Sequence, residues 1–367
     1  MRPSVRKVDV ALLGGGPAGS ATALALARHG GFSIALLERS SYDNVRVGET
    51  LPPEVRFLLQ SLGGWDQFVR HVPCASPGIR YVWGEKDVHD SNSIFNPYGT
   101  SWHIDRGRFD AMLARTAENS GAYLFTGASR TSCSEGKSGD WEICSKLGGK
   151  QFIVHAKLLV DATGRASMLA RKRGARRILY DHLVGVVVFL SVREGSALGD
   201  STFVEAVEDG WWYSALLPNS RAVVAHMTDA DLNARGHNRP LEYWQSQLSK
   251  TIHTKALINR CALDSGPHIF AADSSKLNTP LGKNWLAAGD AAMAFDPLSS
   301  QGVYKALESG IRAARAIREH FDGDTGALRR YVREVDDTFD QYRVMRNKYY
   351  GMERRWPRST FWRRRLS

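Results

Sequence analysis

The sequence predicts an α/β fold with a parallel β-sheet and glycine-rich turns at its edge, on three observations. An apolar run, 8–13, leads through several glycines into an Ala/Leu-rich segment, 20–29, which is the pattern of a buried strand followed by a helix. A second apolar run, 32–37, follows. Two later apolar runs, 158–164 and 284–289, also end in glycine turns. These units indicate a doubly wound sheet of the dinucleotide-binding type.

Length and composition are those of a globular chain with two joined units. The 367 residues include 43% hydrophobic and 24% charged residues, and the length exceeds the roughly 150 residues of a typical domain. No run approaches the ~20 apolar residues that span a bilayer, and the basic start leads into the glycine turn instead of a cleavage site, so we expect no transmembrane segment or signal peptide. Four scattered cysteines predict reduced thiols, a cytoplasmic location and no metal site.

The first glycine turn has the spacing Gly14-x-Gly16-x-x-Gly19. Gly14 permits the tight turn, Gly16 allows the backbone to approach a pyrophosphate, and Gly19 allows the helix to pack on the strand. The helix N-terminus offers free N–H groups to phosphate. Glu38 follows about 20 residues later, where an acidic residue binds a ribose hydroxyl; alone it would be a surface charge at a strand end. We assign a dinucleotide site to Gly14, Gly16, Pro17, Ala18, Gly19, Glu38 and Arg39.

Two later segments distinguish FAD from NAD as the ligand. Residues 158–165 read LLVDATGR, and residues 284–302 contain WLAAGDAA and DPLSSQG. With the first turn, they resemble the FAD-binding fingerprints of the glutathione-reductase-like flavoproteins, in the branch of flavin-dependent aromatic hydroxylases and tryptophan halogenases. The resemblance implies a Rossmann-type FAD-binding domain with FAD as cofactor, Asp290 near the ribityl chain and pyrophosphate, and the turn 297–302 at the flavin ring. The FAD contacts implied by these segments are Asp161, Gly164, Asp290, Pro297, Gly302 and Val303.

The same resemblance assigns two more segments to the flavin. Residues 45–53, VRVGETLPP, resemble the segment that lies along the flavin, which implies contacts from Arg46, Gly48 and Glu49. Arg108, in the sequence DRGRFD, resembles the flavin-contacting arginine of the family. The alternative for Arg108 is an ordinary charge on a helix surface, where residues three apart are neighbours.

A second domain is predicted to cover the flavin. After residue 180 there is no further glycine-rich strand-turn-helix unit for a nicotinamide, and no C-x-x-C or C-x-x-x-x-C pair for dithiol chemistry. Strand-like runs occur instead at 183–192, 211–217 and 222–227. We expect an inserted β-sheet substrate domain. The expected boundaries are 1–72, 102–178 and 268–322 for the FAD-binding domain, 73–101 and 179–267 for the substrate domain, and 323–367 for a basic, aromatic, helical C-terminal segment.

The activity that the resemblance implies is monooxygenation. Reduced FAD and O2 would give a C4a-hydroperoxide that attacks an electron-rich aromatic, while the protein orients the substrate and excludes water. NAD(P)H or a separate flavin reductase would supply the electrons. Glu49, His103 and Tyr213 are the candidate catalytic residues, and the other candidates to line the cavity are Trp102, Trp211, Trp212 and Met293. The alternatives are a Trp-Trp-Tyr run that belongs to the core and a structural His103.

Halogenation is the second activity that the resemblance allows. Halogenases of this branch use an essential lysine, and Arg80 stands at the matching position in ASPGIRYVW. A guanidinium stays charged and is a poor nucleophile, so it does not replace an amine. The W-x-W-x-I-P motif of the halogenases is also changed, to GWWYSALLP at 210–218. These departures rank hydroxylation above halogenation.

A narrower resemblance concerns the substrate. The sequences WWYS and DPLSSQG, with YYGMERRWP and Phe361-Trp362 near the end of the chain, resemble the flavoprotein maturases of quinone-cofactor amine and amino-acid oxidases. The resemblance implies hydroxylation of a tryptophan side chain in a precursor oxidase, during tryptophylquinone formation. An alternative of a different class is a flavin-binding chaperone that holds the precursor without oxygenating it.

The net charge of +11 suits binding to nucleic acid, to an acidic lipid surface or to an acidic partner protein. Much of this charge lies at the end of the chain, in Arg354, Arg355, Arg358, Arg363, Arg364 and Arg365. The alternative is a terminal helix whose aromatic residues pack on the body while its arginines are solvated. No nucleic-acid-binding motif accompanies the charge, so we expect no nucleic-acid partner.

Overall fold

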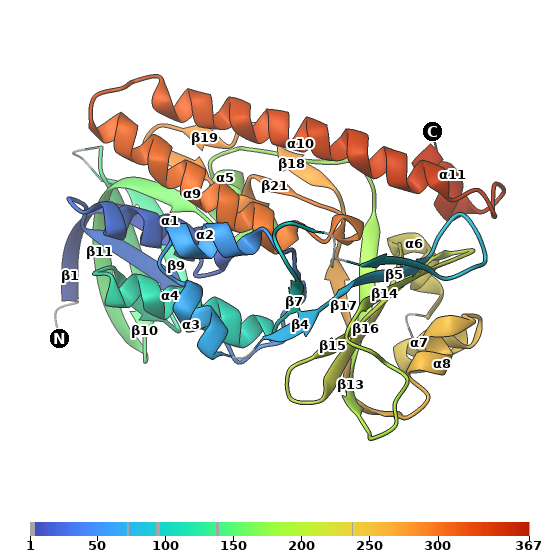
Figure 1. The fold of residues 1–367 in the computed structure, drawn as a ribbon. Helices are drawn as coiled ribbons and strands as arrows, with labels where there is room; N and C mark the ends of the chain where they lie inside the picture. The colour runs from blue at the N-terminus through green and yellow to red at the C-terminus, as the bar shows by residue number, and fades with distance from the viewer. Residues whose placement is uncertain (1–3, 72, 93–95, 137–138, 237, 367) are drawn as a thin grey trace.

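The computed structural model describes residues 4–71, 73–92, 96–136, 139–236 and 238–366. It is an α/β fold in which a sheet covered by helices lies beside a second, mostly antiparallel sheet (Figure 1). Two long helices, α9 (Gly302–Phe321) and α10 (Ala327–Met352), extend along one side of the molecule (Figure 1). The predicted fold class, a Rossmann-type domain with a β-sheet domain and a helical C-terminal segment, is confirmed.

The first sheet has the strand order β19-β20-β11-β1-β2-β8, with β10 and β9 beside β11. β1 pairs in parallel with β2 and β11, and β11 pairs in parallel with β20, so the carboxyl ends of these four strands meet at one edge. The strands are β1 (Ser4–Leu13), β2 (Ile34–Glu38), β8 (Tyr123–Thr126), β9 (Ser129–Glu135), β10 (Trp141–Leu147), β11 (Lys150–Asp161), β19 (Leu281–Gly282) and β20 (Trp285–Ala287).

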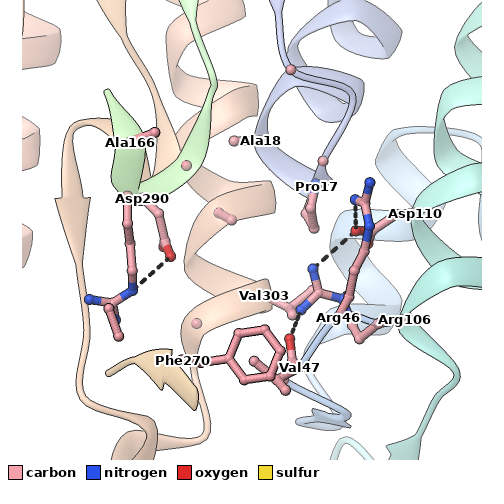
Figure 2. A pocket seen from close by; sticks show the side chains of 18 of the residues that line it. Pro17, Ala18, Arg46, Val47, Arg106, Asp110, Ala166, Phe270, Asp290 and Val303 are labelled. Atoms are coloured by element: carbon pink, nitrogen blue, oxygen red, sulfur yellow. Dashed lines mark hydrogen bonds and ion pairs between the residues drawn. The ribbon is translucent and has the colours of Figure 1, made fainter. Parts of the chain in front are cut away.

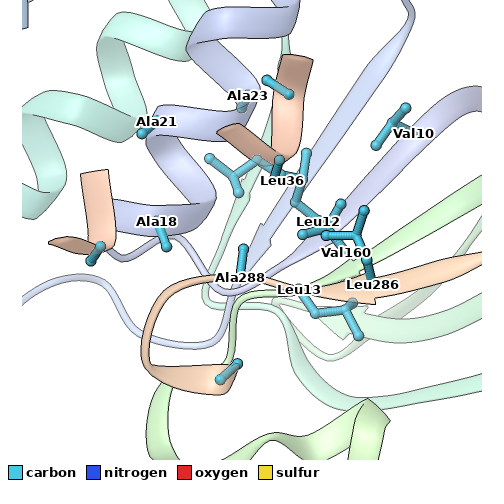
Figure 3. Packing of buried hydrophobic residues seen from close by; sticks show 14 of the residues in the cluster. Val10, Leu12, Leu13, Ala18, Ala21, Ala23, Leu36, Val160, Leu286 and Ala288 are labelled. Carbon is cyan, nitrogen blue, oxygen red and sulfur yellow. The ribbon is translucent and has the colours of Figure 1, made fainter. Parts of the chain in front are cut away.

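The core around the first sheet consists of the apolar runs from which the strands were predicted. Leu12 of β1 has Leu36 and Val160 as its register partners on either side (Figure 3). Ala21 and Ala23 belong to the helix that follows β1, α1 (Pro17–His29), and all five side chains are fully buried. Because strands and helix pack so closely, the N-terminus of α1 is fixed at the carboxyl edge of the sheet.

The second sheet has the order β17-β13-β16-β15-β14-β5-β6. β5, from the first third of the chain, pairs in parallel with β14, while the other neighbours are antiparallel. One face packs through Trp212 on Trp244 of α7 (Pro240–Ser249). The strands are β5 (Gly78–Val82), β6 (His89–Asn92), β13 (Leu183–Val192), β14 (Thr202–Val207), β15 (Gly210–Leu217), β16 (Arg221–Asp229) and β17 (Cys261–Ala271).

Shorter elements connect the two sheets. Two further sheets have the orders β3-β7-β4 and β12-β18-β21. Their strands are β3 (Thr50–Leu51), β4 (Cys74–Ser76), β7 (Ser101–His103), β12 (Arg177–Leu179), β18 (Ser275–Leu277) and β21 (Met293–Ala294). The other helices are α2 (Val55–Ser61), α3 (Trp65–Arg70), α4 (Arg106–Asn119), α5 (Met168–Lys172), α6 (Ala230–Asn233), α8 (His253–Leu257) and α11 (Thr360–Leu366), with 3-10 turns η2 (Gly164–Ala166), η3 (Ala234–Gly236), η4 (Gly289–Ala291) and η5 (Pro297–Ser299).

Helix α10 links the two parts of the molecule. Near its start, the Tyr331 hydroxyl donates to the carbonyl of Ala287 in β20 (3.0 Å). Near its end, the Tyr350 hydroxyl accepts from the indole N–H of Trp211 in β15 (3.1 Å). None of the helices in the described residues is long and apolar enough to cross a membrane.

Candidate functional site

A cavity of about 710 Å³ lies where the carboxyl edge of the first sheet meets the second sheet. Its walls are the glycine turn after β1, the ends of β2 and β11, the N-termini of α1 and α9, and the strands β13, β16 and β17. Figure 2 shows Asp290 on one side and Arg46 and Arg106 on the other, with Phe270 toward the far end. The cavity therefore extends from the glycine turn to the inner face of the second sheet.

Each of the three glycines of the first turn is required, or allowed, for a different structural reason. Gly14 has φ +105°, and a Cβ there would lie 2.2 Å from the Ala162 carbonyl oxygen. A Cβ on Gly19 would lie 1.9 Å from the Gly14 oxygen, so this glycine lets α1 pack on the sheet. A Cβ on Gly16 would meet no described atom within 4 Å, and Gly16 begins α1 without a side-chain cap. The first N–H groups of α1 thus face open space in the cavity.

Glu38 both lines the cavity and fixes the glycine turn. Its Oε2 accepts from the backbone N–H of Gly15 (2.7 Å), and its Oε1 accepts from Ser40 and from Arg46 (3.2 Å). Arg46 also pairs with the fully buried Asp110 (2.7 Å). Arg39 is exposed at the edge of the cavity. These contacts hold the Glu38 carboxylate and the Arg46 guanidinium at the end of β2.

Asp161 has a different place from the one expected, because its carboxylate is turned away from the cavity. Oδ1 accepts from the backbone and hydroxyl of Thr163, and Oδ2 accepts from the N–H of Ala170 (2.9 Å). Asp161 therefore shapes the turn, while Gly164 and Arg165 line the cavity. Arg165, which follows Gly164 directly in the sequence, was missed as a site residue.

Asp290 and the start of α9 form the opposite wall. The Asp290 carboxylate lies 3.7 Å from Nε of Arg165. Pro297, Gly302 and Val303 also line the cavity, and a Cβ on Gly302 would meet no described atom within 4 Å. The N-terminus of α9, a helix of 20 residues, thus meets the cavity and favours negative charge there.

The arginine of α4 that reaches the cavity is Arg106, not Arg108. Arg108 is exposed, and its backbone N–H is bonded to the Asp105 side chain that caps α4. Arg106 lies two residues earlier, on the inner side of the same helix, where it pairs with Asp110 (3.1 Å) and donates to the carbonyl of Val47. The expected position of Arg108 is wrong because two residues along a helix correspond to about 200° of rotation, so Arg106 and Arg108 lie on opposite sides of α4.

Glu49 is a buried carboxyl group in the wall of the cavity. Its Oε2 accepts from the N–H of Gly48 (3.0 Å), and its buried Oε1 has no hydrogen-bond partner among the described residues. Burial raises the pKa of Glu49 to about 7, against the opposing effect of Arg106. With this pKa, the Glu49 carboxyl group can both hold and release a proton near neutral pH.

A chain of hydroxyl groups leads away from the cavity beside Glu49. The hydroxyl of Tyr213, which lines the cavity, lies 2.8 Å from Oγ1 of Thr50. Thr50 is 3.4 Å from Thr202, and Thr202 is 2.8 Å from Nε2 of His103. His103 itself is fully buried outside the cavity lining, and burial lowers its pKa to about 4. The position of His103 therefore agrees with the structural alternative and not with direct contact with a substrate.

The predicted lining includes Glu49 and Tyr213, which the structure places in the cavity wall, but its tryptophans and Met293 lie elsewhere. Trp102, Trp211, Trp212 and Met293 are not among the residues that line the cavity. Trp102 packs on Trp65 and Phe68, and Trp212 is stacked on His226 at the other face of the sheet. Besides Tyr213, the second sheet lines the far end with small and aliphatic side chains and one phenyl ring, from Gly185, Val187, Val223, Ala225, Met227 and Phe270.

These missed residues follow an alternation that the sequence contains. Successive side chains of a strand point to opposite faces, so 185 and 187 share a face, as do 223, 225 and 227. The alternation was hidden because both faces of this sheet are buried and both sets are apolar. No group of His, Cys, Asp and Glu in the described residues is arranged to hold a metal ion.

The family model described as FAD binding domain matches residues 7–342 of this chain. The chain belongs to the FAD-binding domain family. Its cofactor is FAD, and it is a flavin-dependent oxidoreductase.

A curated relative of this FAD-binding protein spans nearly the same length. LodB of Marinomonas mediterranea, described as a putative FAD-dependent oxidoreductase, is 30% identical over 368 residues, which cover 97% of this chain and 96% of LodB.

Solved structures share the fold. The flavin-dependent halogenase CmlS superposes with a TM-score of 0.87 at 24% identity, covering 98% of this chain and 67% of CmlS. QhpG, described as a peptidyl tryptophan dihydroxylase essential for tryptophylquinone cofactor biogenesis, gives a TM-score of 0.77 at 22% identity, covering 98% of this chain and 79% of QhpG.

The cavity of this FAD-binding protein fits a flavin dinucleotide. The open space beside Gly16 leaves room for a pyrophosphate at the free N–H groups of α1. Glu38 and Arg39 line the cavity at the end of β2, where the ribose of the adenosine half would lie. Asp290 and the N-terminus of α9 line the part toward the second sheet, next to the apolar end.

Proposed function

We propose that this flavoprotein is a monooxygenase that hydroxylates an electron-rich aromatic, a tryptophan side chain of a partner precursor protein. The observation that carries the proposal is the continuity of the cavity: the dinucleotide end opens without a partition into an apolar end under β13, β16 and β17. An indole ring fits this chemistry, because the second sheet contributes Val187, Ala225, Met227 and Phe270 to the lining and no charged side chain.

The residues of the chain would bind, orient and protect. Bound reduced FAD supplies the activation of O2. The aliphatic side chains of β13 and β16 exclude water from the reacting end. Oε1 of Glu49, which is buried and has no partner among the described residues, is placed to hold or accept a proton, and the Tyr213 hydroxyl is oriented by Thr50.

The relatives support the proposal in different degrees. LodB, at 30% identity and nearly full length, supports oxidoreductase chemistry on FAD. QhpG is described as a peptidyl tryptophan dihydroxylase, which agrees with the maturase resemblance of the sequence, and at 22% identity the likeness is one of fold. O2 and a reductant, NAD(P)H or a flavin reductase, complete the proposed reaction.

Mass spectrometry of a co-expressed precursor tests this proposal. A precursor of a quinone-cofactor oxidase would be produced together with the holoenzyme and supplied with a reductant and 18O-labelled O2. We expect one tryptic peptide of the precursor to gain labelled oxygen on tryptophan. If O2 is consumed with the precursor bound and no labelled tryptophan forms, the proposal is wrong, and if O2 is not consumed at all, the chaperone alternative replaces it.

Halogenation is the second candidate, favoured by the fold shared with CmlS. The chemistry of the cavity opposes it, because no lysine is among the described residues that line the cavity. Arg80, at the position matched to the halogenase lysine, is exposed on β5. Holoenzyme given reductant, bromide and free tryptophan should form no bromotryptophan, and a brominated product would reverse the ranking.

A further inference from the structure

Residues 343–366 form a strongly basic end of the molecule. They include nine Lys or Arg residues and one acidic residue, Glu353. The segment comprises the last turns of α10, a connecting turn and α11, which lie together at the end of the molecule next to the second sheet (Figure 1). We call this segment the basic end.

Only some of these Lys and Arg side chains form ion pairs within the protein. Arg346 pairs with Asp181 and Asp296, Arg355 with Glu353, and Arg364 and Arg365 with Asp229. The other cations are exposed and form no ion pair with any described residue: Arg343, Lys348, Arg354, Arg358 and Arg363. The alternative of a terminal helix with packed aromatic residues and solvated arginines therefore describes Phe361, Trp362 and Arg363, but not the buried Arg365.

Apolar side chains lie among the free cations. Met345, Tyr349 and Met352 have exposed fractions of 49%, 45% and 50% and follow one flank of α10 at spacings of four and three residues. Exposed methionines on a helix are typical of surfaces that bind apolar side chains of a partner. Charge alone would suit any polyanion, whereas this apolar flank favours a protein.

The basic end is fixed to the body of the protein. The Trp362 indole donates to the Val207 carbonyl (2.9 Å), the Ser359 hydroxyl donates to the Glu208 carbonyl (2.6 Å), and Arg365 pairs with Asp229 (2.7 Å). A surface held in this way loses little conformational entropy when a partner binds.

The inner side of the basic end reaches the wall of the flavin cavity. The Tyr350 hydroxyl donates to Asp296 (2.7 Å), and Nε of Arg346 lies 3.3 Å from the same carboxylate, which lines the cavity. A partner on the outer side of α10 would thus be separated from Asp296 by about the 10 Å diameter of a helix. The basic end is therefore in direct contact with one residue of the cavity wall, through Arg346 and Tyr350.

We propose that the basic end, residues 343–366, is the docking surface for an acidic, amphipathic segment of the precursor protein. The proposal rests on the proposed function, because it names the chemistry of its partner. Asp and Glu of the segment pair with Arg354, Arg358 and Arg363, and its apolar side chains cover Met345, Tyr349 and Met352. The encounter is accelerated by the charge and slowed by salt.

Binding of a synthetic peptide tests the docking surface without turnover. The probe is a fluorescein-labelled helical peptide of Asp, Glu and Leu with one tryptophan, and a Lys/Leu peptide of the same pattern is its counterpart. Fluorescence anisotropy with FAD-loaded protein compares Arg354→Glu/Arg358→Glu/Arg363→Glu with the matched control Arg70→Glu/Arg115→Glu/Lys150→Glu. The control changes the same net charge on exposed residues of α3, α4 and β11.

We expect the first triple variant to weaken binding of the acidic peptide about tenfold or more and the control to change it less than about threefold. Met345→Gln/Met352→Gln tests the apolar flank at unchanged charge and should weaken binding as well. Equal losses in both triple variants, or no binding of the acidic peptide, overturn the proposal. Duplex DNA or phosphatidylserine vesicles that bind the same surface more tightly than the acidic peptide also overturn it.

The outcome is separate from that of the proposed function. A precursor that gains no oxygen while the acidic peptide binds at the basic end would leave a docking surface on a protein of another activity. Hydroxylation that persists when the peptide does not bind would retain the function and refute the docking surface.

Discussion

Glu49 combines burial, an unpartnered oxygen and a position in the cavity wall. Its pKa of about 7 lies above the ordinary value of 4.5 because the carboxylate is desolvated. Between these two pH values the folded chain keeps a proton that the unfolded chain has released. The stability contributed by this protonated group is full below about pH 4.5 and is lost as the pH rises through about 7.

Glu49→Gln should therefore change the pH dependence of stability. The wild type loses the stability contributed by protonated Glu49 as the pH rises, whereas glutamine does not titrate. In FAD-free protein, the difference in free energy of unfolding, variant minus wild type, should therefore rise by up to about 3 kcal/mol from acidic to mildly alkaline pH. Urea denaturation across this range measures it. Glu118→Gln, an exposed glutamate of α4, is the control. A flat difference for Glu49→Gln would mean that its carboxyl titrates normally.

The two arginines of α4 allow a matched test of the FAD site. Arg106→Ala removes a buried guanidinium from the cavity wall, while Asp110 keeps Arg46 as a partner (2.7 Å). We expect Kd for FAD to rise about tenfold, because a hydrogen bond to a charged group is worth roughly 1.5–3 kcal/mol. Arg108→Ala should leave Kd unchanged. Flavin fluorescence titration of apoprotein measures both, and a larger effect of Arg108→Ala would restore the original assignment.

Asp290 and Asp273 form a second matched pair, because both carboxylates lie beside Arg165, at 3.7 and 3.1 Å. Asp290 also lines the cavity, and Asp273 does not. Asp290→Ala should yield protein with less than about half of the bound FAD, through a loss of one or more charge-assisted hydrogen bonds. Asp273→Ala should stay fully yellow. The ratio of flavin to protein absorbance decides, and equal yellow colour in both would contradict the role of Asp290.

At the scale of elements, tight contact between helices depends on glycine. A Cβ on Gly310 of α9 would lie 2.4 Å from the Ala18 carbonyl oxygen of α1, in contact with backbone that cannot move away. Gly310→Ala should lower the free energy of unfolding by about 1–3 kcal/mol. Gly351→Ala is the control, since a Cβ there meets no described atom within 4 Å and alanine favours α10. Thermal unfolding compares the two, and equal melting temperatures would mean that α1 and α9 can separate.

The regular elements that the sequence predicted are those with a single strong signal. The valine-rich run 183–192 became β13 with the same bounds, because β-branched residues leave no competing helix pattern. The first helix begins at Pro17, earlier than expected, because proline is favoured in the first turn. The positions of Arg108 and His103 depend on which face of α4 and of β7 is buried. That choice is made by contacts with distant strands, which a local pattern does not contain.

At the scale of the whole molecule, the end of the chain ties the second sheet to the helices of the FAD-binding part. Asp229 ends β16 and is almost fully buried between Arg365 and Arg364, at 2.7 and 2.8 Å. The Arg365 guanidinium also lies 3.5 Å from the centre of the Phe361 ring. The sequence showed an arginine-rich terminus but not that one arginine is buried, because its partner lies more than 130 positions earlier.

Arg365→Met should therefore act on the stability of the whole protein. It keeps the apolar stem but leaves Asp229 buried with Arg364 alone, and removal of one partner of a buried pair costs about 3 kcal/mol. Arg363→Met, at an exposed position of the same helix, should change the free energy of unfolding by less than about 0.5 kcal/mol. Urea denaturation of the holoprotein measures both. Adding Asp229→Asn to Arg365→Met should recover part of the loss, because the cost lies in the carboxylate left without its partner. If the double variant is instead destabilised by the sum of the two single losses, the cost lies in the packing around Phe361.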